Sequence, residues 1–212
     1  MVVKQSRTGG ITMNLKQLSP SITDMIRFDH SHVMVTFHQY SKDKSPTVKK
    51  ALADTICDGL EIHAQLEEEI FYPVMRRRDG KEPFIHEAEP EHDEMRRLIA
   101  ELRATSGSDP RHDDLVMELM RDVMHHVAEE ETKLLPDAEA ILGKQRLSEL
   151  GADMTRRRMQ LVGPKAGKLA KEHLVGFSGS TAAIVVGVAG AVLAAFALKP
   201  KKSTWKGQPA NT

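Results

Sequence analysis

The chain has 212 residues, enough for one sizeable domain with an appendage but short for two full domains, and its 4% of aromatic residues favours helices over sheets. Its one cysteine, Cys57, excludes an internal disulfide. The net charge of zero is unevenly divided, since residues 1–150 carry 20 Lys and Arg against 28 Asp and Glu, whereas residues 151–212 carry 10 against 2. The acidic character of residues 1–150 argues against nucleic-acid binding by this part of the chain.

Residues 1–20 are polar, contain two adjacent glycines and lack the apolar run of a secretory signal, so we expect a flexible leader. A helix is expected to begin near Ser21, because Asp24 three residues later completes a capping-box-like start. After a break at 42–47, Pro46 suits the first turn of a second helix, which covers roughly 47–71 and ends at Pro73. A charged loop is expected at 76–83.

Two further helices complete the pattern. The third is expected to start close to Pro90 and to continue to about Thr105, and the fourth to run from about 111 to 135 and to stop at Pro136. Short polar loops join all four helices. The sequence therefore predicts an all-α fold, an up-down-up-down four-helix bundle over residues 21–160 that includes a C-terminal helical extension at 137–161.

The C-terminal part differs in character. A basic linker is expected at 161–175, and residues 176–198 contain no charged side chain. At about 1.5 Å per residue this run is just long enough to cross a bilayer core of roughly 30 Å. We therefore expect a transmembrane tail helix, followed by a basic tail at 199–212, that anchors the protein to a membrane and leaves the bundle in the cytoplasm. The Ala and Gly content of the run leaves open a cytoplasmic protein in which 176–198 packs on the bundle or on a partner.

The helical register places one histidine on the apolar stripe of each of the four helices. Two of the stripes add a glutamate four residues after the histidine, where the two side chains are neighbours. A buried carboxylate without a partner is costly, and imidazole with carboxylate but without thiolate suits iron, manganese or zinc. The candidate metal ligands are His30, His63, Glu67, His92, His126 and Glu130.

The same pattern occurs twice along the chain. HAQLEEEIFYP (63–73) aligns with HVAEEETKLLP (126–136), and DHSHV (29–33) resembles EHDEM (91–95). His30 precedes His63 by 33 residues, and His92 precedes His126 by 34. The repeat predicts two similar helical hairpins and a pseudo-symmetric site with one metal ion in each half.

A pair of H-x-x-x-E-E motifs followed by Pro, each preceded by a lone helical histidine, resembles the hemerythrin-like HHE cation-binding domain over about residues 21–136. The resemblance implies a non-haem di-iron centre that is ligated by the six matching residues and bridged by Glu67 and Glu130. Oxygen-carrying hemerythrins have an H-x-x-x-H pair on the third helix, whereas here Arg96 stands four residues after His92. We therefore do not expect reversible oxygen carriage.

Alternatives to this ligand set stay open. His125 rivals His126, because Glu129 lies four residues after it, but polar neighbours favour a solvated position for His125. The remaining acidic residues of the two motifs are expected around the site or on the surface rather than as ligands, and they are Glu68, Glu69 and Glu131.

The resemblance implies a protein that senses or handles a small oxidant such as oxygen, peroxide or nitric oxide. The alternatives are a di-iron oxidoreductase with peroxidase-like or nitric-oxide-reducing activity, and an iron-centre repair or iron-homeostasis protein, so enzymatic activity is left open. Repair proteins of this kind usually carry an N-terminal cysteine, and residues 1–20 have none. The expected partners are a diatomic ligand or peroxide and, through 176–198, a membrane.

Overall fold

The computed structural model describes residues 20–79 and 82–176, and every element within these ranges is helical. Four long helices are joined in the order α1 (Ile22–Gln39), α2 (Pro46–Leu66), α4 (Glu82–Ala104) and α5 (Pro110–Glu129). A π-helical turn, η2 (Glu67–Phe71), connects α2 to α3 (Tyr72–Asp79), and a second one, η3 (Glu130–Leu134), connects α5 to α6 (Leu135–Val162). The predicted all-α four-helix bundle is confirmed.

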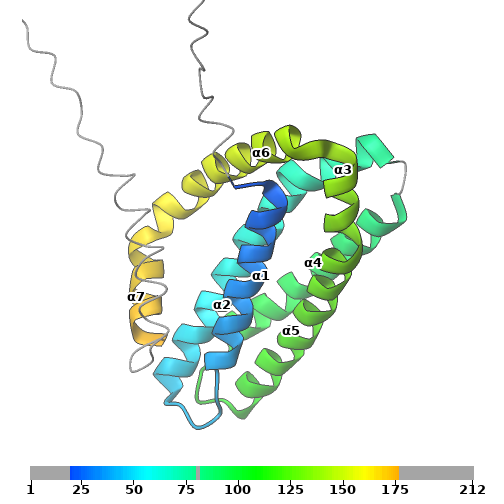
Figure 1. Cartoon of the computed structure of the whole chain (residues 1–212). Helices are drawn as coiled ribbons and strands as arrows, with labels where there is room; N and C mark the ends of the chain where they lie inside the picture. The colour runs from blue at the N-terminus through cyan, green and yellow to red at the C-terminus, as the bar shows by residue number, and fades with distance from the viewer. Residues whose placement is uncertain (1–19, 80–81, 177–212) are drawn as a thin grey trace, which may run out of the picture.

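Two shorter elements close the described chain: a 3-10 turn, η4 (Gly163–Lys165), and α7 (Ala166–Gly176). Figure 1 shows α6 arching over one end of the bundle and α7 lying alongside α2, which it contacts over its length. Gly143 gives α6 its bend, because its φ of 70° lies in the left-handed region that glycine adopts without strain.

The predicted helix starts agree with the observed caps. The Ser21 hydroxyl accepts a hydrogen bond from the Asp24 N–H, and the Asp24 carboxylate accepts one from the Ser21 N–H, which completes a capping box. Ser45 caps α2, with Pro46 in the first turn.

The boundaries predicted at the other prolines are wrong. The chain remains helical through Pro73 to Asp79 and through Pro136 into α6, and α4 begins at Glu82 with Pro90 inside it, so most of the loop expected at 76–83 is helix. A proline ring crowds the carbonyl four residues earlier in a regular helix. Pro73 and Pro136 both follow a π-turn, whose hydrogen bonds run five residues back, and this offset lets the helix continue.

The segment expected as a basic linker at 161–175 is helical, comprising the end of α6, η4 and nearly all of α7. Lys168 of α7 donates to Asp58 of α2 over 3.0 Å, and a Cβ atom on Gly176 would lie 3.0 Å from a Leu52 methyl group. The expected leader at 1–20, the tail helix at 176–198 and the basic tail at 199–212 fall outside the described residues, apart from Pro20 and Gly176. Among the residues that are described, no helix combines the length and apolar character needed to span a membrane.

Two apolar clusters fill the bundle and leave a polar layer between them. One cluster joins the start of α1 to α3 and α6 and includes Ile26, Phe71 and Leu134. The other joins the middle of α2, α4 and α5 and includes Ile56 and Leu98. The candidate ligands occupy the positions between these clusters on every helix, so the packing on both sides holds them in place.

Candidate metal centre

All six candidate ligands meet in the polar layer of the bundle. Each is buried, with at most 6% of its surface exposed. His30 comes from α1, His63 from α2, His92 from α4 and His126 from α5, while Glu67 and Glu130 are the first residues of the two π-turns. The structure therefore brings together the set that the repeat predicted.

One group of potential ligand atoms gathers around His30 and His63. The His30 Nε2 atom lies 3.4 Å from Glu130 Oε2, and the His63 Nε2 atom lies 3.3 Å from Glu67 Oε2. One ligand atom from each of these four residues lies within 4.8 Å of the others, as donors around a single ion would.

A second group gathers around His92 and His126. Their Nε2 atoms are 3.2 Å apart, and Glu67 Oε2 lies 3.5 Å from His92 Nε2. Glu130 Oε2 lies 3.7 Å from His126 Nε2. Glu67 belongs to both groups, and Glu130 reaches a histidine of each, so the two carboxylates stand between two adjacent positions for a cation.

The outer ring nitrogen, Nδ1, of each histidine faces a carboxylate. The Nδ1 atoms of His30, His63, His92 and His126 lie 2.9, 3.4, 2.9 and 2.8 Å from Glu131, Asp29, Glu68 and Glu91, respectively. An ionised carboxylate only accepts hydrogen bonds, so each Nδ1 carries the proton and donates it. The Nε2 lone pair then faces the interior, which is the arrangement of a metal-ligating histidine.

The inner atoms lack the partners that burial demands. His30 Nε2, His63 Nε2, Glu67 Oε1 and Glu130 Oε2 are buried and make no hydrogen bond. In the other group, two Nε2 lone pairs face each other over 3.2 Å. Two nitrogens that ligate one ion at about 2.1 Å stand about 3 Å apart, so a shared cation would turn this repulsion into bonding. The donor set fits a pair of metal ions.

The pKa values of these groups are shifted from their usual ranges in the metal-free protein. Burial and the neighbouring Glu130 carboxylate raise the pKa of Glu67 well above its usual range. Burial also acts to raise the pKa of Glu130, but the close approach of His30, whose Nε2 lies 3.4 Å away, and of the His126 and His63 imidazoles lowers it to about 2. Burial lowers the pKa of His63 to about 4. Protons thus partly replace the missing positive charge, and binding of a cation would release them.

A tyrosine that the sequence did not single out completes the layer. The Tyr72 hydroxyl lies 3.2 Å from Glu67 Oε2 and 2.9 Å from Glu130 Oε1, and its ring stacks on His92 with the ring centres 5.7 Å apart. Burial and the two carboxylates raise the pKa of Tyr72, which keeps the phenol protonated and able to donate.

The outer carboxylates were found only in part from the sequence. Glu68 and Glu131 follow the two candidate bridging residues and were expected around the site or on the surface. Asp29 and Glu91 begin the matching segments DHSHV and EHDEM, and each bonds the histidine of the other helix in its hairpin. The repeat itself was the signal that could have found them, since Asp29 and Glu91 hold equivalent positions in it.

The structure also locates Arg96, whose position in the sequence argued against an oxygen carrier, and His125, the rival of His126 as a ligand. Arg96 donates to Glu68 and Asp93, so its guanidinium lies against the carboxylate that contacts His92 Nδ1. The side chain of His125 is 68% exposed, whereas that of His126 is buried at 4%, which agrees with the choice of His126.

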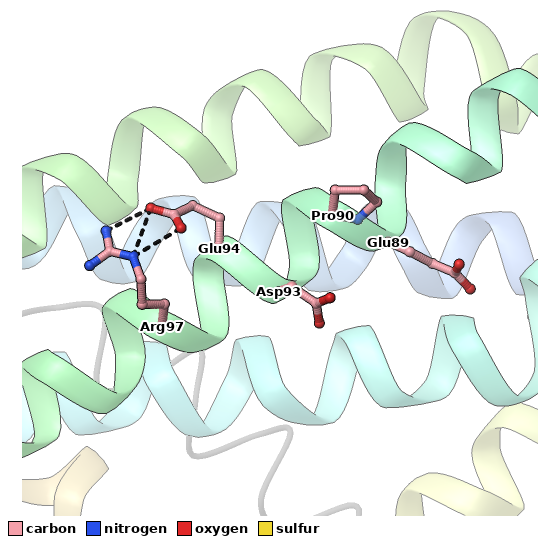
Figure 2. Close-up of a pocket in the computed structure, with 5 residues that line it drawn as sticks. All are labelled: Glu89, Pro90, Asp93, Glu94 and Arg97. Carbon is pink, nitrogen blue, oxygen red and sulfur yellow. Dashed lines mark hydrogen bonds and ion pairs between the residues drawn. The ribbon is translucent and has the colours of Figure 1, made fainter.

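A separate hollow of about 490 Å³ lies on the outer face of α4. Figure 2 shows its lining, all from α4, with Glu94 and Arg97 hydrogen-bonded to each other; the lining residues are Glu89, Pro90, Asp93, Glu94 and Arg97. It contains none of the six candidate ligands, so it is separate from the polar layer inside the bundle.

Known proteins resemble this chain in sequence and in fold. The family model for the hemerythrin HHE cation binding domain matches residues 21–138. A protein from Nostoc named DNA nickase is 34% identical over 124 residues, which are 58% of this chain and 35% of the relative. The chain thus spans about a third of the length of that relative, whose name describes the longer protein.

A solved structure has the same fold. It is a hemerythrin HHE cation binding domain-containing protein from Mycobacterium kansasii, which aligns with a TM-score of 0.60 and 22% identity and covers 71% of this chain and 93% of its own. The family match covers more than half of the chain and includes all six residues of the polar layer. The chain therefore belongs to the hemerythrin HHE cation-binding domain family.

Proposed function

We propose that the chain holds a non-haem di-iron centre and uses it to sense or handle a small oxidant such as oxygen, peroxide or nitric oxide. The family match supports the binding of a metal cation. The number of ions is argued from the two groups of donor atoms that share Glu67. Their composition, imidazole and carboxylate without thiolate, suits iron more than a copper or iron–sulfur centre.

The chain's own residues would orient the ligands and hold protons. The four outer carboxylates fix the histidine rings with Nε2 inward. The Tyr72 hydroxyl can donate a hydrogen bond to either candidate bridging carboxylate, and it is the buried proton donor nearest to both. Six side chains cannot saturate two ions that prefer five or six ligands, so positions remain for a small molecule. Bound iron would supply one-electron redox chemistry at those positions.

The apolar clusters on both sides would limit the size of what enters. Ile26 and Leu66 lie within about one helical turn of His30 and Glu67, and both are fully buried. This packing favours a diatomic molecule or peroxide over a larger organic substrate. Arg96 stands at the position of the extra histidine of oxygen carriers and is bonded to Glu68, which supports redox handling or sensing over carriage.

One experiment tests the number and kind of ions. Purified full-length protein should contain two irons per chain and, when oxidised, absorb in the near ultraviolet as oxo-bridged ferric pairs do. Exposing the reduced protein separately to oxygen, peroxide and nitric oxide should then change the spectrum with at least one of them. A single zinc and no iron would show that the di-iron proposal is wrong.

A second candidate function is enzymatic, either peroxide or nitric oxide reduction or the repair of iron centres. The buried Tyr72 hydroxyl favours an activity that requires a proton at the centre. Turnover of peroxide by the iron-loaded protein, absent in the metal-free protein, would support this version over a sensor that binds without consuming.

We also propose that the tail at 176–198 associates with a membrane. This rests on the uncharged sequence and its flanking lysines, which suit a membrane interface.

A further inference from the structure

The two halves of the candidate metal centre differ in the contacts that their outer carboxylates make. In the half with His30 and His63, the outer carboxylate Asp29 gives both oxygens to the guanidinium of Arg158 on α6, at 2.6 and 2.5 Å. In the other half, Glu91 holds the equivalent position of the repeat. Its Oε2 accepts from His126 over 2.8 Å, and its Oε1 lies 3.7 Å from Nε2 of the exposed His125.

The residues one position before His63 and Glu67 also differ from their equivalents before His126 and Glu130. On α2 they are Ile62 and Leu66, which are buried in the apolar cluster shared with α6. The equivalent residues of α5, 63 positions later, are His125 and Glu129. The repeat is therefore broken here, and the half that α6 does not cover carries side chains able to bind a metal ion.

The geometry of this second set suits a cation. One ligand atom from each of Glu91, His125 and Glu129 lies within 4.8 Å of the others. Bonds of about 2.1 Å to one ion place neighbouring donors roughly 3–3.6 Å apart, so small side-chain rotations would close the site. His125 and Glu129 are four residues apart on a helix, the spacing that His126 and Glu130 use one position further along. Lys133 donates to Glu129 over 2.8 Å and would have to be displaced, which suits a weak site.

We propose that Glu91, His125 and Glu129 form a surface cation site through which a divalent metal ion reaches the half of the centre held by His92 and His126. Glu91 contacts both His125 outside and His126 inside, so an ion bound there is one side chain away from the buried donors. The opposite half offers no equivalent route at Asp29, because Arg158 occupies that carboxylate and α6 covers its neighbours. This inference rests on the metal centre proposed above.

The test is the rate at which the metal-free, full-length protein takes up Co²⁺ after rapid mixing, followed by visible absorption. The variant His125→Ala with Glu129→Gln should load at least five-fold more slowly than the wild type and still reach the same final two ions per chain. The control is His38→Ala with Glu118→Gln, which changes a histidine and a glutamate away from the site and should load at the wild-type rate. The single variant His125→Asp keeps a possible ligand at this position and should therefore load at most of the wild-type rate.

The outcomes separate the two proposals. An unchanged loading rate in the double variant would overturn the surface site, because it shows that these residues have no role in loading. A final metal content below that of the wild type would also overturn it, because it shows that these residues hold the buried ions. A wild type that takes up fewer than two ions would contradict the dinuclear centre instead, and the comparison of rates would still decide the surface site.

Discussion

The Tyr72 hydroxyl donates a hydrogen bond to Glu130 over 2.9 Å, across the boundary between the two repeats of the chain. Tyr72 belongs to the first repeat, and Glu130 begins the π-turn of the second. The equivalent of Tyr72 in the second repeat is Leu135, which cannot donate. The pseudo-symmetric centre therefore has its one buried phenol on one side, and the two candidate bridging carboxylates share it.

Replacing Tyr72 with Phe should weaken the metal-free fold more than the metal-loaded fold. Without a cation, the two buried carboxylates share the hydroxyl as a hydrogen-bond donor, and losing a donor to a buried polar group costs about 1–3 kcal/mol. Bound ions would satisfy the same oxygens. Urea denaturation with and without metal measures both effects, and equal losses in the two states would show that the phenol does not serve the carboxylates.

The variant Glu67→Gln should weaken metal binding and gain metal-free stability. The two carboxylates are buried side by side, and the raised pKa of Glu67 shows that its charge opposes folding when no cation is present. An amide keeps the shape and removes that charge, so we expect a gain of about 1–3 kcal/mol in the free energy of unfolding of the metal-free protein.

Metal content and thermal unfolding of chelator-treated protein check this pair of effects together. Glu118→Gln, on the outer part of α5, is the control and should leave both unchanged. A Glu67→Gln variant that still binds two ions as tightly as the wild type would remove this carboxylate from the centre.

The bundle and the meeting of the six candidate ligands were predictable because both follow from periodicity. One histidine on each apolar stripe, with Glu67 and Glu130 one turn after His63 and His126, places six side chains at one level of any bundle with these helices. The Ser21 capping box and Pro46 likewise act locally, so the helix starts were correct.

The parts that the sequence could not predict depend on long-range packing or on backbone offsets. Pro73 and Pro136 indicate helix ends by every local rule, but the π-turns before them let the helices continue. Those turns also start at the candidate bridging residues. The pairing of Asp29 with His63, rather than with its neighbour His30, is set by how α1 and α2 pack, and no spacing along the chain contains that information.

Cys57 should be unreactive in the native protein. It is fully buried, and burial raises the pKa of its thiol to about 12, so almost no thiolate exists at neutral pH. A thiol reagent at pH 8 should modify none of the native protein and one cysteine per chain in denaturant. Fast modification of the native protein would show that α2 opens locally.

The metal-free protein should lose stability as the pH falls below about 6.5, and His112 should account for part of this loss. His112 is fully buried, and burial together with the charge of Lys49 lowers its pKa. The folded state therefore favours the neutral ring, which is held by the Tyr40 hydroxyl over 2.8 Å. This contribution is complete above the pKa of the unfolded chain and is lost as the unfolded chain takes up a proton at lower pH.

Denaturation curves at pH 7 and pH 5 should therefore differ less for His112→Gln than for the wild type. The comparison uses the metal-free protein, because the histidines of the centre compete with protons for metal in the same range. An equal difference in both proteins would mean that His112 does not contribute.

The last prediction concerns the tail, and the position of α7 determines how it should be tested. Because α7 packs along α2 and reaches Asp58 through Lys168, a truncation within it would disturb the bundle. A chain that ends at Gly176 keeps these contacts and removes the uncharged run. The full-length protein should stay with membranes after a carbonate wash, whereas the truncated protein should appear in the supernatant. If both are washed off, the tail is not an anchor, and packing of 177–198 on the bundle or on a partner becomes the better explanation of its apolar sequence.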